Sequence, residues 1–192
     1  MSSGEDFIRY GDLPFQPGNR FVVENLLEEL REPGEWCLDS EEGTVYFLPP
    51  EELTDDSPVV VPVLDCLLDL QGVSHVTISG FTFTETTTGD NYHRFGLEGY
   101  GAMFPIRGWK YCGESLHMED TAYCTVAGNR FDAVGGNAVY LEGRNLKNQI
   151  RHNEFKDVGA NGVCLLGTID RHPMFNQITD NHFDRCGEIL YY

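Results

Sequence analysis

The pattern of hydrophobic and polar residues changes its period at about residue 59. Before this point, the stretch 19–30 (NRFVVENLLEEL) has hydrophobic residues at helical spacing. It predicts a short amphipathic helix that begins at Asn19 and ends before Pro33-Gly34. The stretch 35–50 (EWCLDSEEGTVYFLPP) has two β-rich runs around a polar turn and predicts a hairpin. We therefore expect residues 1–58 to form a small N-terminal module of helix plus hairpin.

From residue 59 onward, short apolar strands alternate with turns that are rich in Gly, Asn and Asp, and no helical spacing remains. The strands can be aligned on pairs of apolar residues, and the two residues of each pair are separated by one intervening residue. These pairs are Leu68/Leu70, Leu116/Met118, Val139/Leu141, Val163/Leu165 and Ile189/Tyr191. The last three steps between pairs are nearly equal in length. The first step, from Leu68 to Leu116, is about twice as long, so it is either two periods or one period that carries an insertion at about 84–113.

Two further sets of residues repeat with the same period. A ladder of aromatic residues runs through Phe83, Phe131, Phe155 and Phe183. Three asparagines come two positions before the last three of these aromatics: Asn129, Asn153 and Asn181. Stacked asparagines can satisfy the backbone groups of a turn, so we expect them at a corner of each coil.

A period of about 24 residues, built from several short strands, predicts a β-solenoid in which coils stack and strands pair in parallel. A β-sandwich would give no such register, and the blades of a propeller repeat at about 40–50 residues. We therefore predict an all-β protein whose residues 59–192 form a right-handed parallel β-helix.

The 192 residues carry a formal net charge of −18, and residues 1–60 hold 15 acidic side chains against 3 basic ones. Such a field repels nucleic-acid phosphates and anionic membranes, so we expect neither as a partner. No apolar run reaches the roughly 18–20 residues that span a bilayer. The first residues, MSSGEDFIRYGD, lack the basic and apolar regions of a signal peptide.

Recognisable cofactor and catalytic motifs are absent. The six cysteines form no CxxC pair, so we expect buried free thiols more than disulfides, and no zinc ribbon. GxSxG, HExxH, the P-loop and GxGxxG do not occur. We expect no cofactor, since the 6–8 oxygen ligands of a Ca²⁺ site cannot be assembled from the sequence.

In the proposed register, the residues between the apolar ones face outward on the first sheet. His117 and Tyr140 then lie one coil apart, as do Glu119 and Glu142. Carboxylates on adjacent coils would be about 5 Å apart, close to the separation in a retaining glycosidase. We predict Glu119 and Glu142 as catalytic residues and His117 and Tyr140 as substrate-binding residues. The alternative is that both carboxylates end their strands and point into solvent.

Two loops add candidate substrate-binding residues. The insertion 84–113 holds Trp109 and Tyr111, whose rings can stack on sugars or simply anchor the loop. The loop 167–177 holds Asp170 and His172, which can act as an acid/base relay or form an ordinary turn.

The stretch 18–52, which begins GNRFVVENLLEEL, resembles the N-terminal module of pectate-lyase-like β-helix proteins. The stretch 113–167, GESLHMED through GVCLLG, is similar to the coils that follow it. This resemblance implies a pectin-lyase-like fold and a secreted or periplasmic, carbohydrate-active protein of the glycoside hydrolase type, as in a family of α-L-fucosidases. It implies no catalytic residue, because those of the relatives are expected on later coils.

The resemblance also implies that the chain corresponds to the N-terminal part of a longer protein, or that its open end is capped by homo-oligomerisation. We therefore expect a poly- or oligosaccharide as partner and, if the chain is an enzyme, a glycoside hydrolase. The alternatives are a non-catalytic glycan-binding or structural module and a polysaccharide lyase. The lyase is disfavoured because no Arg or Lys is expected on the proposed groove.

Overall fold

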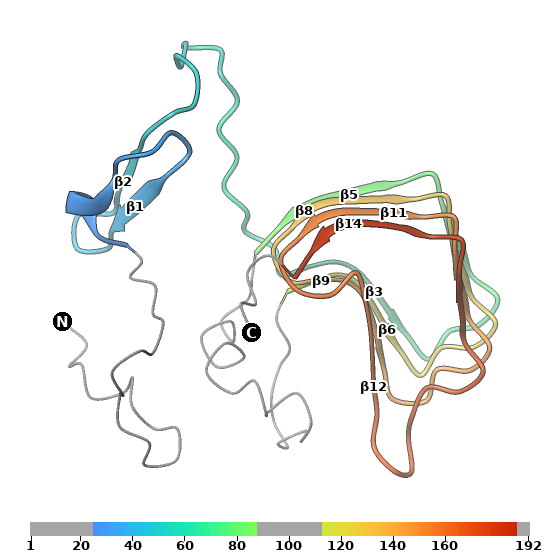
Figure 1. Cartoon of the computed structure of the whole chain (residues 1–192). Helices are drawn as coiled ribbons and strands as arrows, with labels where there is room; N and C mark the ends of the chain where they lie inside the picture. The colour runs from blue at the N-terminus through green and yellow to red at the C-terminus, as the bar shows by residue number, and fades with distance from the viewer. Residues whose placement is uncertain (1–24, 88–112, 188–192) are drawn as a thin grey trace, which may run out of the picture. The chain divides into compact units, whose positions relative to one another are not determined.

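The computed structural model describes residues 25–87 and 113–187 (Figure 1). The chain divides into two units between Val59 and Val60, and each unit is described by itself. Within the described residues, no helix combines the length and the apolar character that crossing a membrane requires.

The first unit contains the predicted hairpin. Strands β1 (Trp36–Asp39) and β2 (Thr44–Phe47) pair in antiparallel register. The Asp39 carboxylate accepts hydrogen bonds from the backbone N–H groups of Glu41 and Glu42, which fixes the turn. The sequence therefore predicted this hairpin correctly.

The predicted helix is wrong in its described part. Only one 3₁₀ turn, η1 (Leu27–Glu29), forms, and Leu26 before it is extended. The Asn25 side chain instead bridges both backbone groups of Leu38, accepting from its N–H at 2.7 Å and donating to its carbonyl at 3.0 Å. This tie to β1 holds Asn25 at a φ of 60°, which ends any helix there. Residues 19–24 lie outside the described residues.

The second unit is a right-handed parallel β-helix (Figure 1). Its described strands form three four-stranded parallel sheets, and each coil contributes one strand to each sheet. The first sheet contains β3 (Cys66–Gln71), β6 (Glu114–Glu119), β9 (Asn137–Glu142) and β12 (Val163–Leu166). The second contains β4 (Thr77–Ser79), β7 (Thr125–Ala127), β10 (Gln149–Arg151) and β13 (Gln177–Thr179). The third contains β5 (Thr82–Thr86), β8 (Arg130–Val134), β11 (Glu154–Val158) and β14 (His182–Cys186).

The register of the first sheet is the one that the sequence predicts. Leu68 pairs with Leu116, Leu116 with Val139, and Val139 with Val163. Because β3 and β6 are direct neighbours, the long step from Leu68 to Leu116 is one coil with an insertion between β5 and β6 rather than two coils. The predicted pair Ile189/Tyr191 lies outside the described residues.

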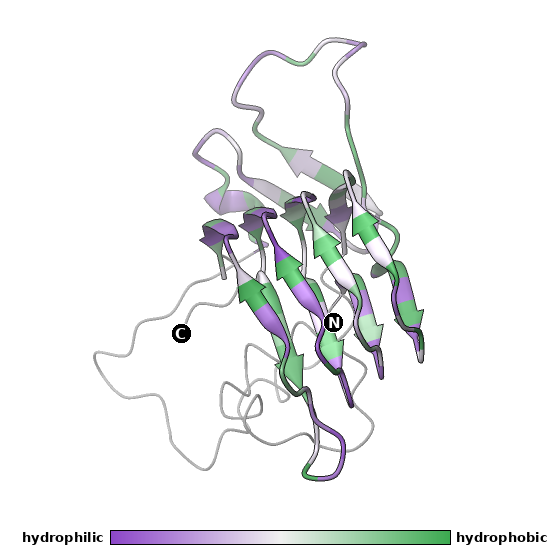
Figure 2. Ribbon diagram, turned by 90° about the vertical axis from the view of Figure 1, so that its right-hand side faces the viewer, coloured by the Kyte–Doolittle hydropathy of each residue, from purple (hydrophilic) through white to green (hydrophobic). Residues whose placement is uncertain are grey.

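Stacked apolar side chains fill the interior of the coils. The four predicted phenylalanines stack with ring centroids 4.8, 4.9 and 4.7 Å apart and nearly parallel planes. Figure 2 shows how hydrophobic positions recur from coil to coil. Phe131 and Phe155, in the central coils, are fully buried. Each coil thus buries its apolar side only against its neighbours.

The asparagine ladder is also present. The backbone N–H of Asn129 donates to Asn153 Oδ1 at 2.9 Å. The backbone N–H of Asn153 donates in the same way to Asn181 Oδ1, one coil further along. Each side-chain amide also donates to a backbone carbonyl of the preceding coil. The amides therefore satisfy the turn between the second and third sheets, as predicted.

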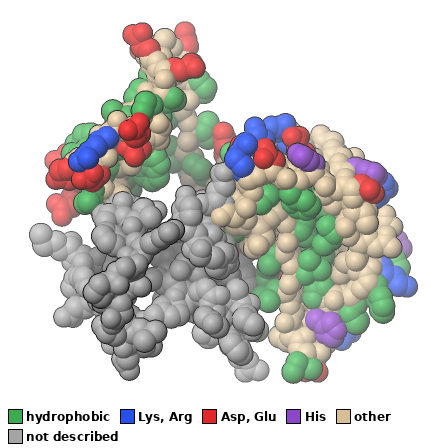
Figure 3. All heavy atoms as spheres, in the orientation of Figure 1, with side chains coloured by type: hydrophobic (Ala, Val, Ile, Leu, Met, Phe, Trp, Pro, Cys, Tyr) green, Lys and Arg blue, Asp and Glu red, His purple; other side chains and the backbone are tan. Residues whose placement is uncertain are grey.

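The two ends of the stacked coils differ in exposure. At the end formed by β12, β13 and β14, Leu165, Ile178 and Phe183 are 41%, 40% and 48% exposed. Their counterparts Ile78 and Phe83 on β4 and β5 are buried. Figure 3 shows hydrophobic side chains at the surface of the β12–β14 end.

Candidate functional site

The candidate site lies on the outward face of the first sheet. Because side chains alternate along a strand, the residues between the core positions line up in two outward rows. One row contains Asp69, His117, Tyr140 and Cys164. The other contains Gln71, Glu119, Glu142 and Leu166. All four residues predicted on this sheet thus lie on neighbouring strands.

His117 lies at the centre of the site and contacts three neighbours. Its Nδ1 is 2.9 Å from Asp69 Oδ1 on β3, and its Nε2 is 3.4 Å from Glu142 Oε2 on β9. The Tyr140 ring stacks on the imidazole at a centroid distance of 5.7 Å. The Asp69 contact favours the tautomer in which Nδ1 carries the proton, so the Nε2 lone pair faces Glu142.

Glu119 has a different partner. The Arg171 guanidinium, from the loop after β12, donates to Glu119 Oε1 at 3.1 Å and also contacts the Asp120 carboxylate. Burial alone would raise the pKa of Asp120, but hydrogen bonds from the Arg144 N–H and from Arg171 lower it on balance. A side chain at Gly143, whose φ is +72°, would meet Asp120 and Arg171.

Glu119 and Glu142 are therefore neighbours whose surroundings differ. They occupy the same register on β6 and β9, and their side chains are 32% and 34% exposed. A guanidinium stabilises the negative charge of Glu119, whereas Glu142 faces an imidazole nitrogen. The two carboxyl groups therefore have different immediate partners, a guanidinium for Glu119 and an imidazole for Glu142.

Glu114, at the start of β6, is a third carboxyl group close to the site. Its pKa is raised from 4.5 to about 7, mainly by burial and to a smaller extent by the carboxylates of Asp65 and Glu142, against the opposing effect of His117. A carboxyl group that titrates near neutrality can both donate and accept a proton under physiological conditions.

The thiols beside the site are not nucleophiles. Burial raises the pKa of the Cys164 thiol to about 11, and burial followed by the charge of Glu114 raises that of Cys66. Both groups therefore remain protonated at neutral pH, and neither supplies the thiolate that cysteine chemistry requires.

The remaining predicted residues are not part of this cluster. His172 Nδ1 lies 3.2 and 3.1 Å from the carbonyl oxygens of Thr168 and Ile169, so it is engaged with its own turn. Asp170 is exposed, and its carbonyl accepts from Arg144. Trp109 and Tyr111 lie outside the described residues.

Sequence reasoning missed two members of the site. Asp69 lies between Leu68 and Leu70, so the same alternation that identified His117 would have identified it. Arg171 corrects the expectation that no Arg or Lys reaches this face, since it contacts Glu119 from a loop. Its position depends on the path of the 167–172 turn, for which the strand pattern gives no signal.

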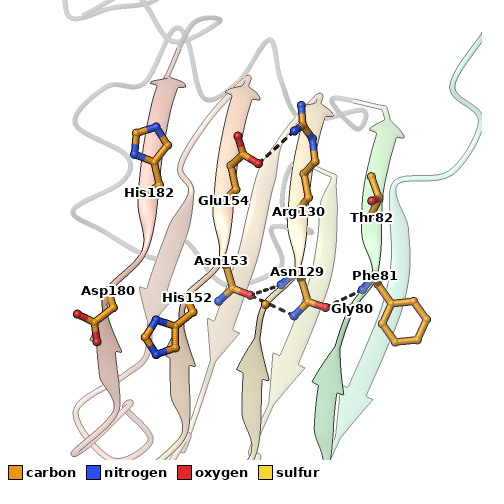
Figure 4. Close-up of a pocket in the computed structure, with 11 residues that line it drawn as sticks. Gly80, Phe81, Thr82, Asn129, Arg130, His152, Asn153, Glu154, Asp180 and His182 are labelled. Atoms are coloured by element: carbon orange, nitrogen blue, oxygen red, sulfur yellow. Dashed lines mark hydrogen bonds and ion pairs between the residues drawn. The ribbon is translucent and has the colours of Figure 1, made fainter.

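A groove lies away from this site, at the corner between the second and third sheets (Figure 4). It is an open groove of about 690 Å³ whose lining includes Phe81, His152 and His182. Its Arg130 is paired with Glu154 at 3.1 Å, and its asparagines belong to the ladder. Several side chains that line the groove therefore already hold neighbouring coils together.

Comparison with known proteins supports the fold. Residues 114–192 match a family model described as a right handed beta helix region. Searches of curated proteins and of solved structures found no match. The parallel sheets and this match together support a right-handed parallel β-helix fold. Among residues 25–87 and 113–187, no group of three or more His, Cys, Asp or Glu side chains is arranged to hold a metal ion.

Proposed function

We propose that the outward face of the first sheet binds a poly- or oligosaccharide and hydrolyses its glycosidic bonds. The observation that carries this proposal is the pair Glu119 and Glu142, which share a register but have different partners, a guanidinium and an imidazole. Hydrolysis of a glycosidic bond needs one ionised carboxylate and one carboxylic acid on either side of the bond. A spacing of about 5 Å between adjacent coils fits the retaining mechanism.

The partners suggest a role for each carboxyl group. Glu119, stabilised as an anion by Arg171, attacks the anomeric carbon while the bond to the leaving oxygen breaks. Glu142 gives its proton to that oxygen, and His117 Nε2, 3.4 Å away, is placed to exchange protons with it. In the second step Glu142 takes a proton from a water molecule, whose oxygen attacks the anomeric carbon and breaks its bond to Glu119.

A non-catalytic glycan-binding module is the second candidate. One observation supports it: Glu119 and Glu142 each already have a partner within the protein, and such fixed side chains suit a binding surface. The lyase alternative gains a cation from Arg171, but this guanidinium contacts two carboxylates and always remains protonated, so it is a poor base.

The test is a glycan array together with a hydrolysis screen on the purified chain. If the proposal holds, Glu119→Gln and Glu142→Gln each lower turnover of a cleaved glycan by about 10²–10⁴-fold, the usual contribution of such a group. Glu154→Gln, on the third sheet, is the matched control and retains activity. Unchanged turnover in both site variants would exclude the pair as catalysts, and binding without cleavage by the unmodified chain would favour the module.

A further inference from the structure

One face of the hairpin in the first unit is apolar and open to solvent. Trp36 lies directly opposite Phe47, and Leu38 lies directly opposite Val45, so the four side chains project from the same side of β1 and β2. Their exposed fractions are 62%, 42%, 38% and 58%, respectively. Cys37, on the other face, is buried. Contiguous exposed apolar side chains commonly mark an interaction site, and a hairpin of two strands is only marginally stable without further packing.

The two edges of this hairpin differ. The Asn25 side chain bonds to both backbone groups of Leu38, so these groups point away from β2, and the β1 edge is occupied there. In an antiparallel pair, the opposite residue Val45 then also points its N–H and C=O away from β1, as does Phe47 two positions further on. Within the described residues these outward groups have no hydrogen-bond partner. The β2 edge can therefore accept a third strand, as the sheets of peptide-binding domains do.

The charge around the hairpin indicates what kind of strand it accepts. Residues 25–59 hold eleven acidic side chains and one basic one, Arg31, which is paired with Glu29 at 3.1 Å. Glu41 and Glu42, in the turn between β1 and β2, are exposed. Figure 3 shows acidic side chains over the surface of this unit. A second copy of the chain would bring the same negative charge and be repelled, whereas a cationic segment would be attracted.

We propose that the β2 edge and the apolar face of the hairpin bind an extended segment of a basic partner protein, in which apolar side chains alternate with Lys or Arg. The segment adds as a third strand and bonds to the outward backbone groups of Val45 and Phe47. Its apolar side chains pack beside those of β2, and its cationic side chains offset the negative charge of the unit. This interaction is separate from glycan binding on the first sheet.

Titration of the full chain with model peptides tests the proposal. Isothermal titration calorimetry would compare octapeptides of alternating Lys and Val, alternating Glu and Val, and alternating Lys and Ser. The Lys-Val peptide should bind at least about tenfold more tightly than either of the others, and more weakly in high NaCl. These comparisons use the unmodified chain, so they do not depend on the folding of any variant.

Variants at one position locate the binding edge. The Val45 N–H points away from β1, so Val45→Pro removes an edge donor and keeps the pairing of the hairpin. It should weaken binding of the Lys-Val peptide at least about tenfold, whereas Val45→Thr should bind it as the unmodified chain does. Ile169→Ser, which removes a 93% exposed apolar side chain in the second unit, is the control and should also leave binding unchanged.

Four results would overturn the proposal. Equal binding of the Lys-Val and Glu-Val peptides would exclude a basic partner, and equal binding of the Lys-Val and Lys-Ser peptides would reveal a general charge effect. Unchanged binding by Val45→Pro, or no binding of any peptide, would exclude strand addition at β2. A dimer of the unmodified chain in light scattering that Val45→Pro dissociates would assign the face to a second copy instead.

Discussion

At the scale of single residues, His117 connects the parts of the candidate site. Its two nitrogens face carboxylates on the strands before and after its own, so one side chain couples three consecutive coils. The stacked Tyr140 ring and the low exposure of the imidazole, 17%, restrict its rotation. A change at this side chain therefore affects contacts with two neighbouring strands at once.

Glu114 provides a prediction at the same scale. Its folded-state pKa, about 7, is above the value of 4.5 expected in the unfolded chain, mainly because the group is buried. Between these values the folded state binds the proton more tightly, so the free energy of unfolding falls as pH rises. The expected loss from pH 4.5 to pH 8 is about 3 kcal/mol. Urea denaturation across this range measures it.

The variant Glu114→Gln is the control for this effect, since glutamine is close in shape and does not titrate. It should flatten the pH dependence and be the more stable protein at pH 8. An equal slope in both proteins would assign the pH dependence to other groups and contradict the raised pKa of Glu114.

At the scale of elements, the strands of the β-helix are held by ladders of identical side chains. The phenylalanine ladder crosses all four strands of the third sheet, with the two central rings fully buried. Because each ring packs on the ring before and after it, removing a central one breaks two stacking contacts and opens a cavity.

Phe155→Ala should therefore lower the free energy of unfolding by about 3–5 kcal/mol. Phe183→Ala is the matched comparison, because among residues 25–87 and 113–187 Phe183 stacks on Phe155 alone, and it is 48% exposed. It should cost less than about 2 kcal/mol. Denaturation midpoints by circular dichroism give both values, and a similar loss in both variants would contradict the ladder as a main source of stability.

The sequence predicted such repeated elements well and the contacts of loops poorly. Phe131, Val139 and Asn153 each belong to a set that recurs once per coil, because every coil meets the same neighbours, so the repeat itself indicates the register. Arg171 has no counterpart in other coils, and its contact with Glu119 depends on the fold of one turn. The predicted helix failed at Asn25 because a contact with β1 overrides the local hydrophobic spacing.

At the scale of the whole molecule, stability is expected to vary along the axis of the β-helix. The strands β6, β8, β9 and β11 have neighbours on both sides and contain most of the fully buried side chains. The strands β12, β13 and β14 pair on one side only within the described residues, and apolar side chains on them are exposed. Each coil depends on its neighbours, so the end coils open more readily than the central ones.

Hydrogen exchange measured by mass spectrometry tests this gradient. Backbone amides of β9 and β11 should exchange at least about tenfold more slowly than those of β13 and β14, because opening the central coils requires more of the structure to unfold. Uniform protection across the four coils would contradict the gradient and indicate that the β-helix opens as one cooperative unit.

The constant register of the coils also has a consequence for the evolution of this fold. Leu116, Val139 and Val163 are interchangeable in position, since each pairs with the coil before it in the same way. Duplication of a gene segment that encodes one whole coil would therefore lengthen the protein without moving any core residue out of alignment. Extra residues in a turn, as between β5 and β6, leave the later coils in register, whereas an insertion of one residue within a strand would turn the buried side chains of that strand outward.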